Sequence, residues 1–398
     1  MKNFKINWTN NSIKYDKKDK ALVMRVMGKA EPFTQGKYLK KFENKFEKYI
    51  GSYGKAYAVA NGSNALDLSA MLIGTNSKDE IIVPAHTWCA TAISFARFGA
   101  KIIWADIDPE SFVVSLKNIR KLVNKKTKAI VIVHLYGMPA NMHEISDFAK
   151  KKNILVIEDC AQSLGSSIDK RKVGTFGDIS IFSFHSNKLI TTLGEGGMLL
   201  VNNKKFQKNV EALRHNGVSP FKRKNKNIYW RPAMSNIINA KENYWPFNFC
   251  LGEIQCALGV QLIDKIEKFN HIRKKRAKKF IQNFYNYPEI RFQKILPRYD
   301  NVYHCLVAHF IGRDNKKKRN KFISIMSKKF KIKIIVQNCP LNRYPLFKKF
   351  NKGQVPNTNY FFDSMISWPF YTYMSEKDFN YMISKTKKCL DILRKKFK

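Results

Sequence analysis

Short apolar runs alternate with amphipathic stretches along residues 55–202. The apolar runs have the length of strands and are rich in isoleucine and valine, as in EIIVPA at 80–85, which is typical of buried strands. Between them, apolar residues recur at the spacing of one helix face, as Ala65, Leu68 and Leu72 do. Strands that alternate with helices predict an α/β fold with a mostly parallel sheet flanked by helices. The expected strands are 55–60, 80–85, 101–108, 128–137, 154–159, 177–184 and 196–202, and the expected helices among them are 63–74, 91–99 and 144–153.

The rest of the chain departs from this alternation. Residues 1–30 are polar and expected to be peripheral, and residues 218–247 are rich in Lys, Asn and aromatic residues without a regular pattern. Residues 251–285 predict one long amphipathic helix that links a large domain to a smaller C-terminal one. Beyond it, an expected strand at 303–311 is mixed with expected helices at 319–330 and 385–398. We therefore predict an N-terminal segment, a large α/β domain and a small α+β domain, at 1–30, 31–265 and 266–398.

Basic residues greatly outnumber acidic ones, 73 against 30, which gives a formal net charge of +43. Such an excess suits a nucleic acid or an anionic membrane as partner, but it also arises when solvated lysines cover every surface. The positive charges are spread over the whole chain and are not interleaved with aromatic residues, so we favour the second interpretation and expect no nucleic-acid partner. The basic helix at 385–398 is likewise interpreted as a docked surface helix rather than a membrane-binding one.

The composition predicts a folded cytoplasmic protein. With 398 residues, 44% of them hydrophobic, the chain is long enough to bury a large core. No apolar run approaches the roughly 18 residues that span a bilayer, so we expect no membrane span, and the N-terminus has no apolar signal-peptide region. The seven cysteines form no CxxC pair and no zinc-like spacing, so we expect reduced thiols and no metal site.

Two acidic residues and a lysine follow strands that are expected to end at the same edge of the sheet. Glu158 and Asp159 end the strand at 154–159, and Lys188 follows the strand at 177–184. Ligands of such sheets bind at the carboxyl ends of the strands, and a lysine buried there is a candidate nucleophile that forms a Schiff base. The alternatives are a helix cap or ion pair for the carboxylates and an ordinary surface lysine for Lys188. Neither stretch alone decides between these interpretations.

Two further stretches add to this picture. In NGSNAL at 61–66, Gly62 and Ser63 open an expected helix, where free backbone N–H groups and a hydroxyl make a phosphate site, although these residues are also ordinary in turns. Trp88 follows the strand at 80–85, where its indole either stacks on a flat ring or fills the core. A phosphate anchor, a stacking aromatic residue, a carboxylate and a lysine are together the parts that hold pyridoxal 5'-phosphate.

The chain resembles the sugar aminotransferases of the DegT/DnrJ/EryC/StrS family, which are fold-type I pyridoxal-phosphate enzymes. The resemblance implies that the chain moves an amino group, from L-glutamate through a pyridoxamine 5'-phosphate form, to a nucleotide-linked keto-sugar in amino-sugar biosynthesis. It also implies a homodimer with shared active sites. The resemblance extends from QGKYLKKFENKF (35–46) to ISWPFYTYMSEKDFNYMI (366–383) and includes NGSNALDL, DEIIVPAHTWCATA, WADIDPESF, VHLYGMPANM, IEDCAQSLG, SFHSNKLITTLGEGGML, NFCLGEIQCALGVQL and YPLF.

The resemblance further implies roles for single residues. Lys188 holds the aldehyde of the cofactor as an imine and then moves protons, and Asp159 pairs with the pyridine nitrogen. His185 and Asn338 are candidate substrate residues, although a packed histidine is an equal alternative for His185. The other expected cofactor contacts are Gln162 to the ring hydroxyl, Trp88 to the ring face, Gly62, Ser63 and Ser183 to the phosphate, and Asn248 to the phosphate of the neighbouring subunit.

This sequence departs from the family pattern at a few positions. Cys250 stands where arginine is common, Ser63 where threonine is common, and Asn338 and Cys339 where histidine or tyrosine often lies near the sugar. These changes leave the cofactor chemistry intact and leave the sugar open. Two alternatives from the same fold are a pyridoxal-phosphate-dependent sugar dehydratase, which has histidine at the lysine position, and a non-catalytic regulatory protein. The presence of Lys188 favours transamination over dehydration, and the intact set of Lys188, Asp159 and Gln162 argues against a non-catalytic protein.

Overall fold

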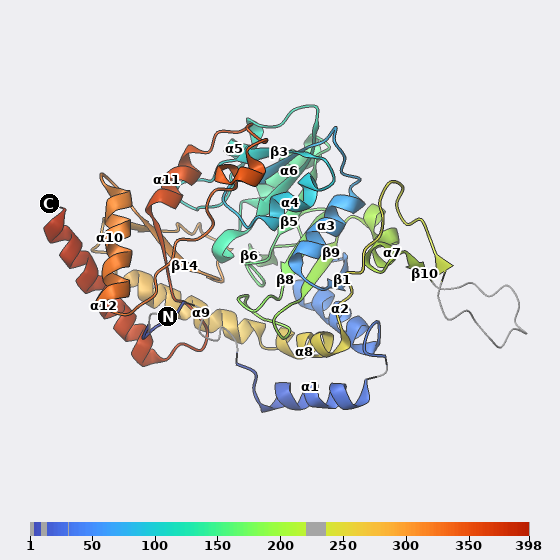
Figure 1. The fold of residues 1–398 in the computed structure, drawn as a ribbon, viewed down its shortest axis with the longest axis horizontal. Helices are drawn as coiled ribbons and strands as arrows, with labels where there is room; N and C mark the ends of the chain where they lie inside the picture. Colours follow the sequence, from blue (N-terminus) through green and yellow to red (C-terminus); the bar gives the residue numbers. More distant parts are fainter. Residues whose placement is uncertain (1–3, 9–13, 31, 220–235, 398) are drawn as a thin grey trace, which may run out of the picture.

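A computed structural model describes residues 4–8, 14–30, 32–219 and 236–397. Its large sheet has seven strands in the order β1-β9-β8-β5-β4-β2-β3 (Figure 1). Neighbouring strands run parallel from β3 to β8, whereas β9 is antiparallel to both β8 and β1. The predicted α/β class with a mostly parallel sheet is confirmed. The strands are β1 (Lys55–Val59), β2 (Glu80–Pro84), β3 (Lys101–Ala105), β4 (Thr127–Val133), β5 (Leu155–Asp159), β8 (Ile179–Ser183) and β9 (Gly197–Val201).

Helices cover both faces of this sheet because successive strand residues point to opposite sides. On β2, Ile81 and Val83 pack in one apolar cluster with helices α3 (Gly62–Leu72) and α4 (Ala90–Ala96). Ile82 packs in a second cluster on the opposite face, together with helix α6 (Met142–Lys151). Beside β8 and β9, helices α2 (Lys37–Ile50) and α8 (Glu253–Ile263) close a third cluster. Both faces of the central strands are therefore apolar, which explains their continuous hydrophobic runs.

The prediction of one long helix at 251–285 is wrong. The structure has two helices there, α8 and α9 (Ile266–Gln282), which are separated by a turn at Asp264 and Lys265. Helix α8 is mostly buried, between α2 and α1 (Lys17–Lys29), whereas α9 buries a single stripe. The Lys265 ammonium pairs with Asp19 of α1 at 2.6 Å. The expected peripheral N-terminal segment thus contains a docked helix at the edge of the molecule (Figure 1). The proposed domain boundaries stay a prediction.

A smaller antiparallel sheet follows, in the order β12-β14-β15. It packs against helices α9, α10 and α12 in one apolar cluster that contains Phe280, Phe322, Trp368 and Phe379. Helix α12 buries its apolar face there, as expected for a docked surface helix. Among the described residues, no helix has the length and apolar character to cross a membrane. These elements are β12 (Ile290–Phe292), β14 (Leu306–Phe310), β15 (Met365–Trp368), α10 (Asn315–Lys328), α11 (Pro356–Ser364) and α12 (Glu376–Lys396).

Short elements complete the described chain. Of the irregular interval expected at 218–247, residues 218–219 and 236–247 are described and the rest lies outside the described residues. The short helices are α5 (Leu116–Arg120), α7 (Val210–Arg214), η1 (Leu135–Gly137), η2 (Lys204–Asn209), η3 (Leu341–Arg343) and η4 (Pro345–Phe347), and the short strands are β6 (Ser167–Ile168), β7 (Arg171–Lys172), β10 (Val218–Ser219), β11 (Asn236–Ile237) and β13 (Tyr299–Asp300).

Candidate active site

Lys188 and Asp159 lie at the carboxyl edge of neighbouring parallel strands. Asp159 is the last residue of β5, and Lys188 lies in the loop that follows β8. That loop is closed by hydrogen bonds from the Ser186 amide to the Gly194 carbonyl (2.9 Å) and from the Lys188 amide to the His185 carbonyl (2.8 Å). Burial lowers the pKa of Lys188, an effect that the negative charge of Asp159 opposes. Burial likewise raises the pKa of Asp159, which Lys188 opposes, so the two side chains are close enough to act on one another.

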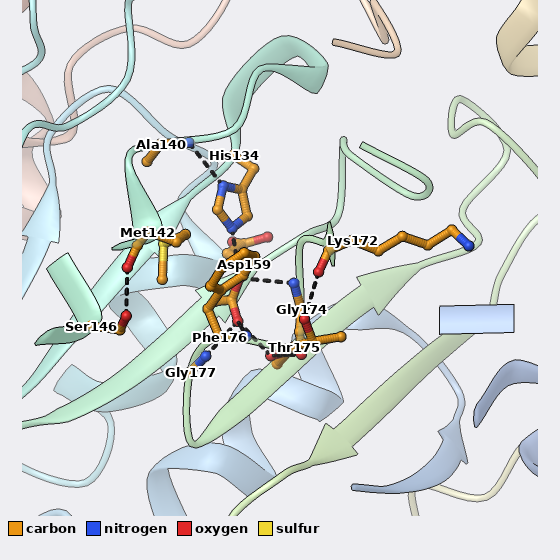
Figure 2. A network of polar contacts seen from close by, with 12 residues as sticks. His134, Ala140, Met142, Ser146, Asp159, Lys172, Gly174, Thr175, Phe176 and Gly177 are labelled. Atoms are coloured by element: carbon orange, nitrogen blue, oxygen red, sulfur yellow. Dashed lines mark hydrogen bonds and ion pairs between the residues drawn. The ribbon is translucent and has the colours of Figure 1, made fainter. Parts of the chain in front are cut away.

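Glu158, the neighbour of Asp159, points to the other face of β5 and supports the structure. Its Oε1 accepts hydrogen bonds from the amides of Phe176 (2.8 Å) and Gly177 (2.6 Å), and its Oε2 from Gly174 (2.8 Å) and the imidazole of His134 (3.0 Å). Figure 2 shows this network, in which His134 in turn accepts a bond from the Ala140 amide. Burial alone would raise the pKa of Glu158, but these bonds lower it. Glu158 therefore fastens the 174–177 turn and is not free to bind a ligand.

The same network accounts for one group of potential metal ligands. Side-chain atoms of His134, Glu158 and Cys160 lie within 4.8 Å of one another. The hydrogen bonds just described occupy the histidine and the carboxylate. Burial also raises the pKa of the Cys160 thiol well above its usual range, which keeps the sulfur protonated and a poor ligand. We assign this group to hydrogen bonding.

Asp159 keeps capacity for a ligand. Its Oδ2 accepts a hydrogen bond from the Thr91 hydroxyl (2.8 Å) and its Oδ1 one from the Ala161 amide (3.1 Å). Each carboxylate oxygen accepts two bonds, so one position remains on each. Thr91 was not predicted, although it lies in the block that contains Trp88. The Gln162 side chain accepts a bond from the Tyr136 amide at 2.8 Å, which fixes its carbonyl oxygen.

The start of helix α3 and the end of β8 form a cradle of donors. A Cβ atom on Gly62 would lie 3.1 Å from the Cβ of Ser183, so this glycine permits the close approach. The Asn61 side chain caps the helix by accepting from the Asn64 amide (2.9 Å). Within the described residues, the amides of Gly62 and Ser63 have no acceptor. Gly62, Ser63 and Ser183 are therefore brought together as the sequence predicted, and free amides at a helix start suit a phosphate.

Trp88 and Asn248 both lie on the surface. The exposed fraction of Trp88 is 65%, so this side chain does not fill the core. Asn248 is exposed, and its side chain accepts from the Cys250 amide at 3.3 Å. The next residue, Phe249, accepts a hydrogen bond from the Ala60 amide (2.8 Å), just before the cradle. Asn248 thus lies near this end of the site but faces outwards.

The two candidate substrate residues differ in their surroundings. The His185 side chain contacts its own loop, with Nδ1 3.3 Å from the Asn187 amide and Nε2 3.8 Å from the Glu195 carboxylate. It is partly exposed, so it is not a packed histidine. Asn338 has a positive φ of 46° and lies beside the buried pair of His86 and Tyr136, whose side chains are 2.7 Å apart.

Sequence reasoning missed two residues that the small sheet brings to the site. Burial lowers the pKa of His304 well below its usual range, and the positive charge of Lys188 lowers it further. Burial raises the pKa of Cys305, which Lys188 opposes. Both therefore lie near Lys188, although they belong to a segment far along the chain. No local signal distinguishes them, because they fall inside a stretch that the sequence predicts as an ordinary strand.

The geometry agrees with comparisons to known proteins. The model of the DegT/DnrJ/EryC1/StrS aminotransferase family matches residues 14–387. This chain belongs to that family. The expected resemblance is confirmed, and with it the fold-type I aminotransferase fold. The chain therefore belongs to a family of sugar aminotransferases.

Individual relatives differ in how much of the chain they match. An uncharacterised protein of Methanocaldococcus jannaschii is 31% identical over 369 residues, 90% of this chain and 92% of the relative. The GDP-perosamine synthase of Vibrio cholerae is 35% identical over 235 residues, 59% of each chain. A GDP-4-keto-6-deoxy-D-mannose 3-dehydratase of Escherichia coli O55:H7 is 27% identical over 73% of this chain and 76% of the relative. A solved structure similar to this one is Helicobacter pylori PseC, an aminotransferase involved in the biosynthesis of pseudoaminic acid. The match has a TM-score of 0.86 at 23% identity and covers 97% of this chain and 99% of the PseC chain. It shows that the two proteins share the fold.

Proposed function

We propose that this family member is a pyridoxal-phosphate-dependent enzyme that moves an amino group from L-glutamate to a nucleotide-linked keto-sugar. The observation that carries the proposal is the position of Lys188 next to Asp159, at one edge of the sheet that also carries the donor cradle of α3. A lysine whose pKa is lowered by burial can lose its proton and act as a nucleophile. The GDP-perosamine synthase relatives support the sugar nucleotide as a substrate class.

The residues present fit the cofactor. The free amides of Gly62 and Ser63, with the Ser183 hydroxyl, would bind its phosphate, and the open positions on Asp159 would accept a hydrogen bond from its ring nitrogen. The cofactor, when bound, would supply an electron sink for the bonds of the donor α-carbon. Lys188 would then take and return the proton at that carbon. Gln162 and Trp88 would fix the ring orientation from its edge and its face.

We also propose that two copies of the chain complete each site. Asn248 lies on the surface near the cradle, and its neighbours Trp245 and Phe247 are 87% and 38% exposed. Exposed aromatic side chains gathered in one segment are typical of interaction surfaces. A second copy covering this segment would bury them and would bring Asn248 to the neighbouring phosphate. Sedimentation should therefore give a dimer, and Asn248→Ala should weaken cofactor binding without dissociating the dimer.

The proposal is tested by absorbance and product analysis. The protein supplied with pyridoxal phosphate should show a visible cofactor band that L-glutamate bleaches. Lys188→Ala should lose that band in the absence of added amines, whereas the exposed control Lys205→Ala should keep it. A panel of keto-sugar nucleotides then identifies the acceptor by glutamate-dependent amination. Retention of the band in Lys188→Ala would show that the assignment of Lys188 is wrong, and a deoxygenated rather than aminated product would favour the dehydratase.

A further inference from the structure

A cavity of about 230 Å³ lies where the small sheet, helix α11 and the loop after β3 meet. Its lining includes Arg291 of β12, His309 of β14, Asn357 and Tyr360 of α11, and Pro109 of the loop. None of these residues belongs to the candidate active site. Liquid water occupies about 30 Å³ per molecule, so the cavity has room for about eight groups of that size. It suits a small metabolite and is too small for a sugar nucleotide.

Arg291 and His309 line the cavity side by side. They lie directly opposite one another in the antiparallel pair of β12 and β14, and opposite residues of such a pair carry their side chains on one face. Arg291 is exposed, and among the described residues no carboxylate forms an ion pair with it. Its positive charge lowers the pKa of His309 further, after burial, so the guanidinium lies close to the imidazole. The cavity therefore has a cation without an acidic partner.

His309 offers a hydrogen-bond acceptor rather than a second cation. Its exposed fraction is 3%, and burial lowers its pKa to about 4, so the ring is neutral at pH 7. The Ser364 hydroxyl donates to the Tyr360 carbonyl (2.7 Å), so in its 3.4 Å contact with Nδ1 of His309 the imidazole N–H is the donor. The lone pair of the neutral ring is then on Nε2. That atom is buried and has no partner within the described chain, although buried polar atoms normally have one.

The rest of the lining is apolar. The rings of Tyr360 and Phe361 lie edge-on to the His309 ring, with centres 5.9 and 5.5 Å away. Pro109 and Ile311 complete this wall. Aromatic and aliphatic side chains of this kind favour the apolar body of a ligand, while a few polar groups fix its orientation.

We propose that this cavity binds a small hydroxy acid, whose carboxylate pairs with Arg291 and whose hydroxyl group donates to Nε2 of His309. The single cation favours one negative charge, and the acceptor nitrogen favours a ligand that carries a donor. The apolar wall favours a compact apolar body between these two groups. The site lies outside the proposed active site, and the inference does not depend on the proposed function.

The test uses three hydroxy acids as probes: 4-hydroxybenzoate, L-lactate and 3-hydroxybutyrate. Calorimetric titration of the full-length protein at constant ionic strength gives the dissociation constant of each. At least one of them should bind, with one site per chain. Arg291→Gln should raise its dissociation constant about tenfold or more, because a charged hydrogen bond is lost. Arg25→Gln is the matched control, since Arg25 is exposed on helix α1 far from the cavity lining, and it should leave the constant unchanged.

A second series tests the hydroxyl group. Benzoate, propionate and butyrate are the same three acids without the hydroxyl, and each should bind the wild-type protein more weakly than its hydroxylated partner. His309→Phe keeps an aromatic ring and removes the acceptor, so in this variant the two acids of a pair should bind equally. Equal affinities in the wild-type protein would overturn the assignment, and this measurement does not require that His309→Phe folds.

The proposal is also overturned if none of the three hydroxy acids binds, or if Arg291→Gln leaves their binding unchanged. Because Arg291 is exposed, its substitution should leave the fold intact, which circular dichroism checks. Binding of inorganic phosphate that depends on Arg291, without binding of any hydroxy acid, would assign the cavity to an inorganic anion and contradict the proposal. These results are separate from the proposed function, which the cofactor band and the amination products test.

Discussion

Glu158→Gln should strongly destabilise the protein even though Glu158 is not expected to touch a ligand. The substitution keeps the shape of the side chain and replaces one carboxylate oxygen by an NH₂ group. Each oxygen of Glu158 accepts from two N–H donors: the Phe176 and Gly177 amides on Oε1, and the Gly174 amide and the His134 imidazole on Oε2. Oε1 also accepts from the Ser180 hydroxyl at 3.4 Å. Whichever way the amide is oriented, its NH₂ group faces two donors.

The magnitude follows from these contacts. A buried donor left without an acceptor costs about 1–3 kcal/mol, so two of them cost about 2–6 kcal/mol. His134 cannot relieve the conflict by moving its proton, because its Nδ1 already accepts from the Ala140 amide at 3.1 Å. A proton on Nδ1 would break that bond, so the cost would only move along the network.

Urea unfolding followed by circular dichroism measures this change. The transition midpoint of Glu158→Gln should fall while the denaturant slope stays constant, which indicates lost stability rather than an altered unfolded state. Glu144→Gln is the matched control, since Glu144 is exposed on helix α6 and its substitution should change stability by less than about 0.5 kcal/mol. A loss below about 1 kcal/mol in Glu158→Gln would refute the reasoning from unsatisfied donors.

Three further outcomes are expected. Burial lowers the pKa values of His86 and His309 to about 4 in the folded protein, below the unfolded value of about 6.5. The free energy of unfolding should therefore be constant above pH 6.5 and fall by about 3 kcal/mol per histidine towards pH 4. In unfolding measured as a function of pH, His86→Gln should show a shallower fall. Gly197→Ala would place a Cβ 2.4 Å from the backbone at the start of α3, so it should lower the melting temperature and weaken cofactor binding, whereas Gly28→Ala, which meets no atom within 4 Å, should not. Trp88→Ala, at a 65% exposed position, should leave the melting temperature within about 2 °C but weaken cofactor binding as measured by dialysis; unchanged binding would contradict the stacking role.

The sequence alone determined the layered fold. Strands of the large sheet carry apolar residues on both faces, and this produces the continuous runs that mark them as strands. Parallel order then places the ends of β5 and β8 at one edge, so Asp159 and Lys188 were expected together from the pattern of elements. The glycine at the start of α3 was expected near Ser183 through the family resemblance. These parts depend on local periodicity and on neighbouring strands.

Tertiary structure alone decided the rest, because those features depend on how distant segments pack. The pattern left Glu158 and Asp159 equivalent, and only the 174–177 turn on one face of β5 shows that Glu158 is occupied while Asp159 retains acceptor positions. The sequence pattern does not mark the turn between α8 and α9, whereas in the structure Lys265 of that turn pairs with Asp19 of α1 at 2.6 Å. Arg273 is one basic residue among 73 in the sequence, and only the packing of distant segments leaves it 4% exposed against the Tyr303 and His304 carbonyls.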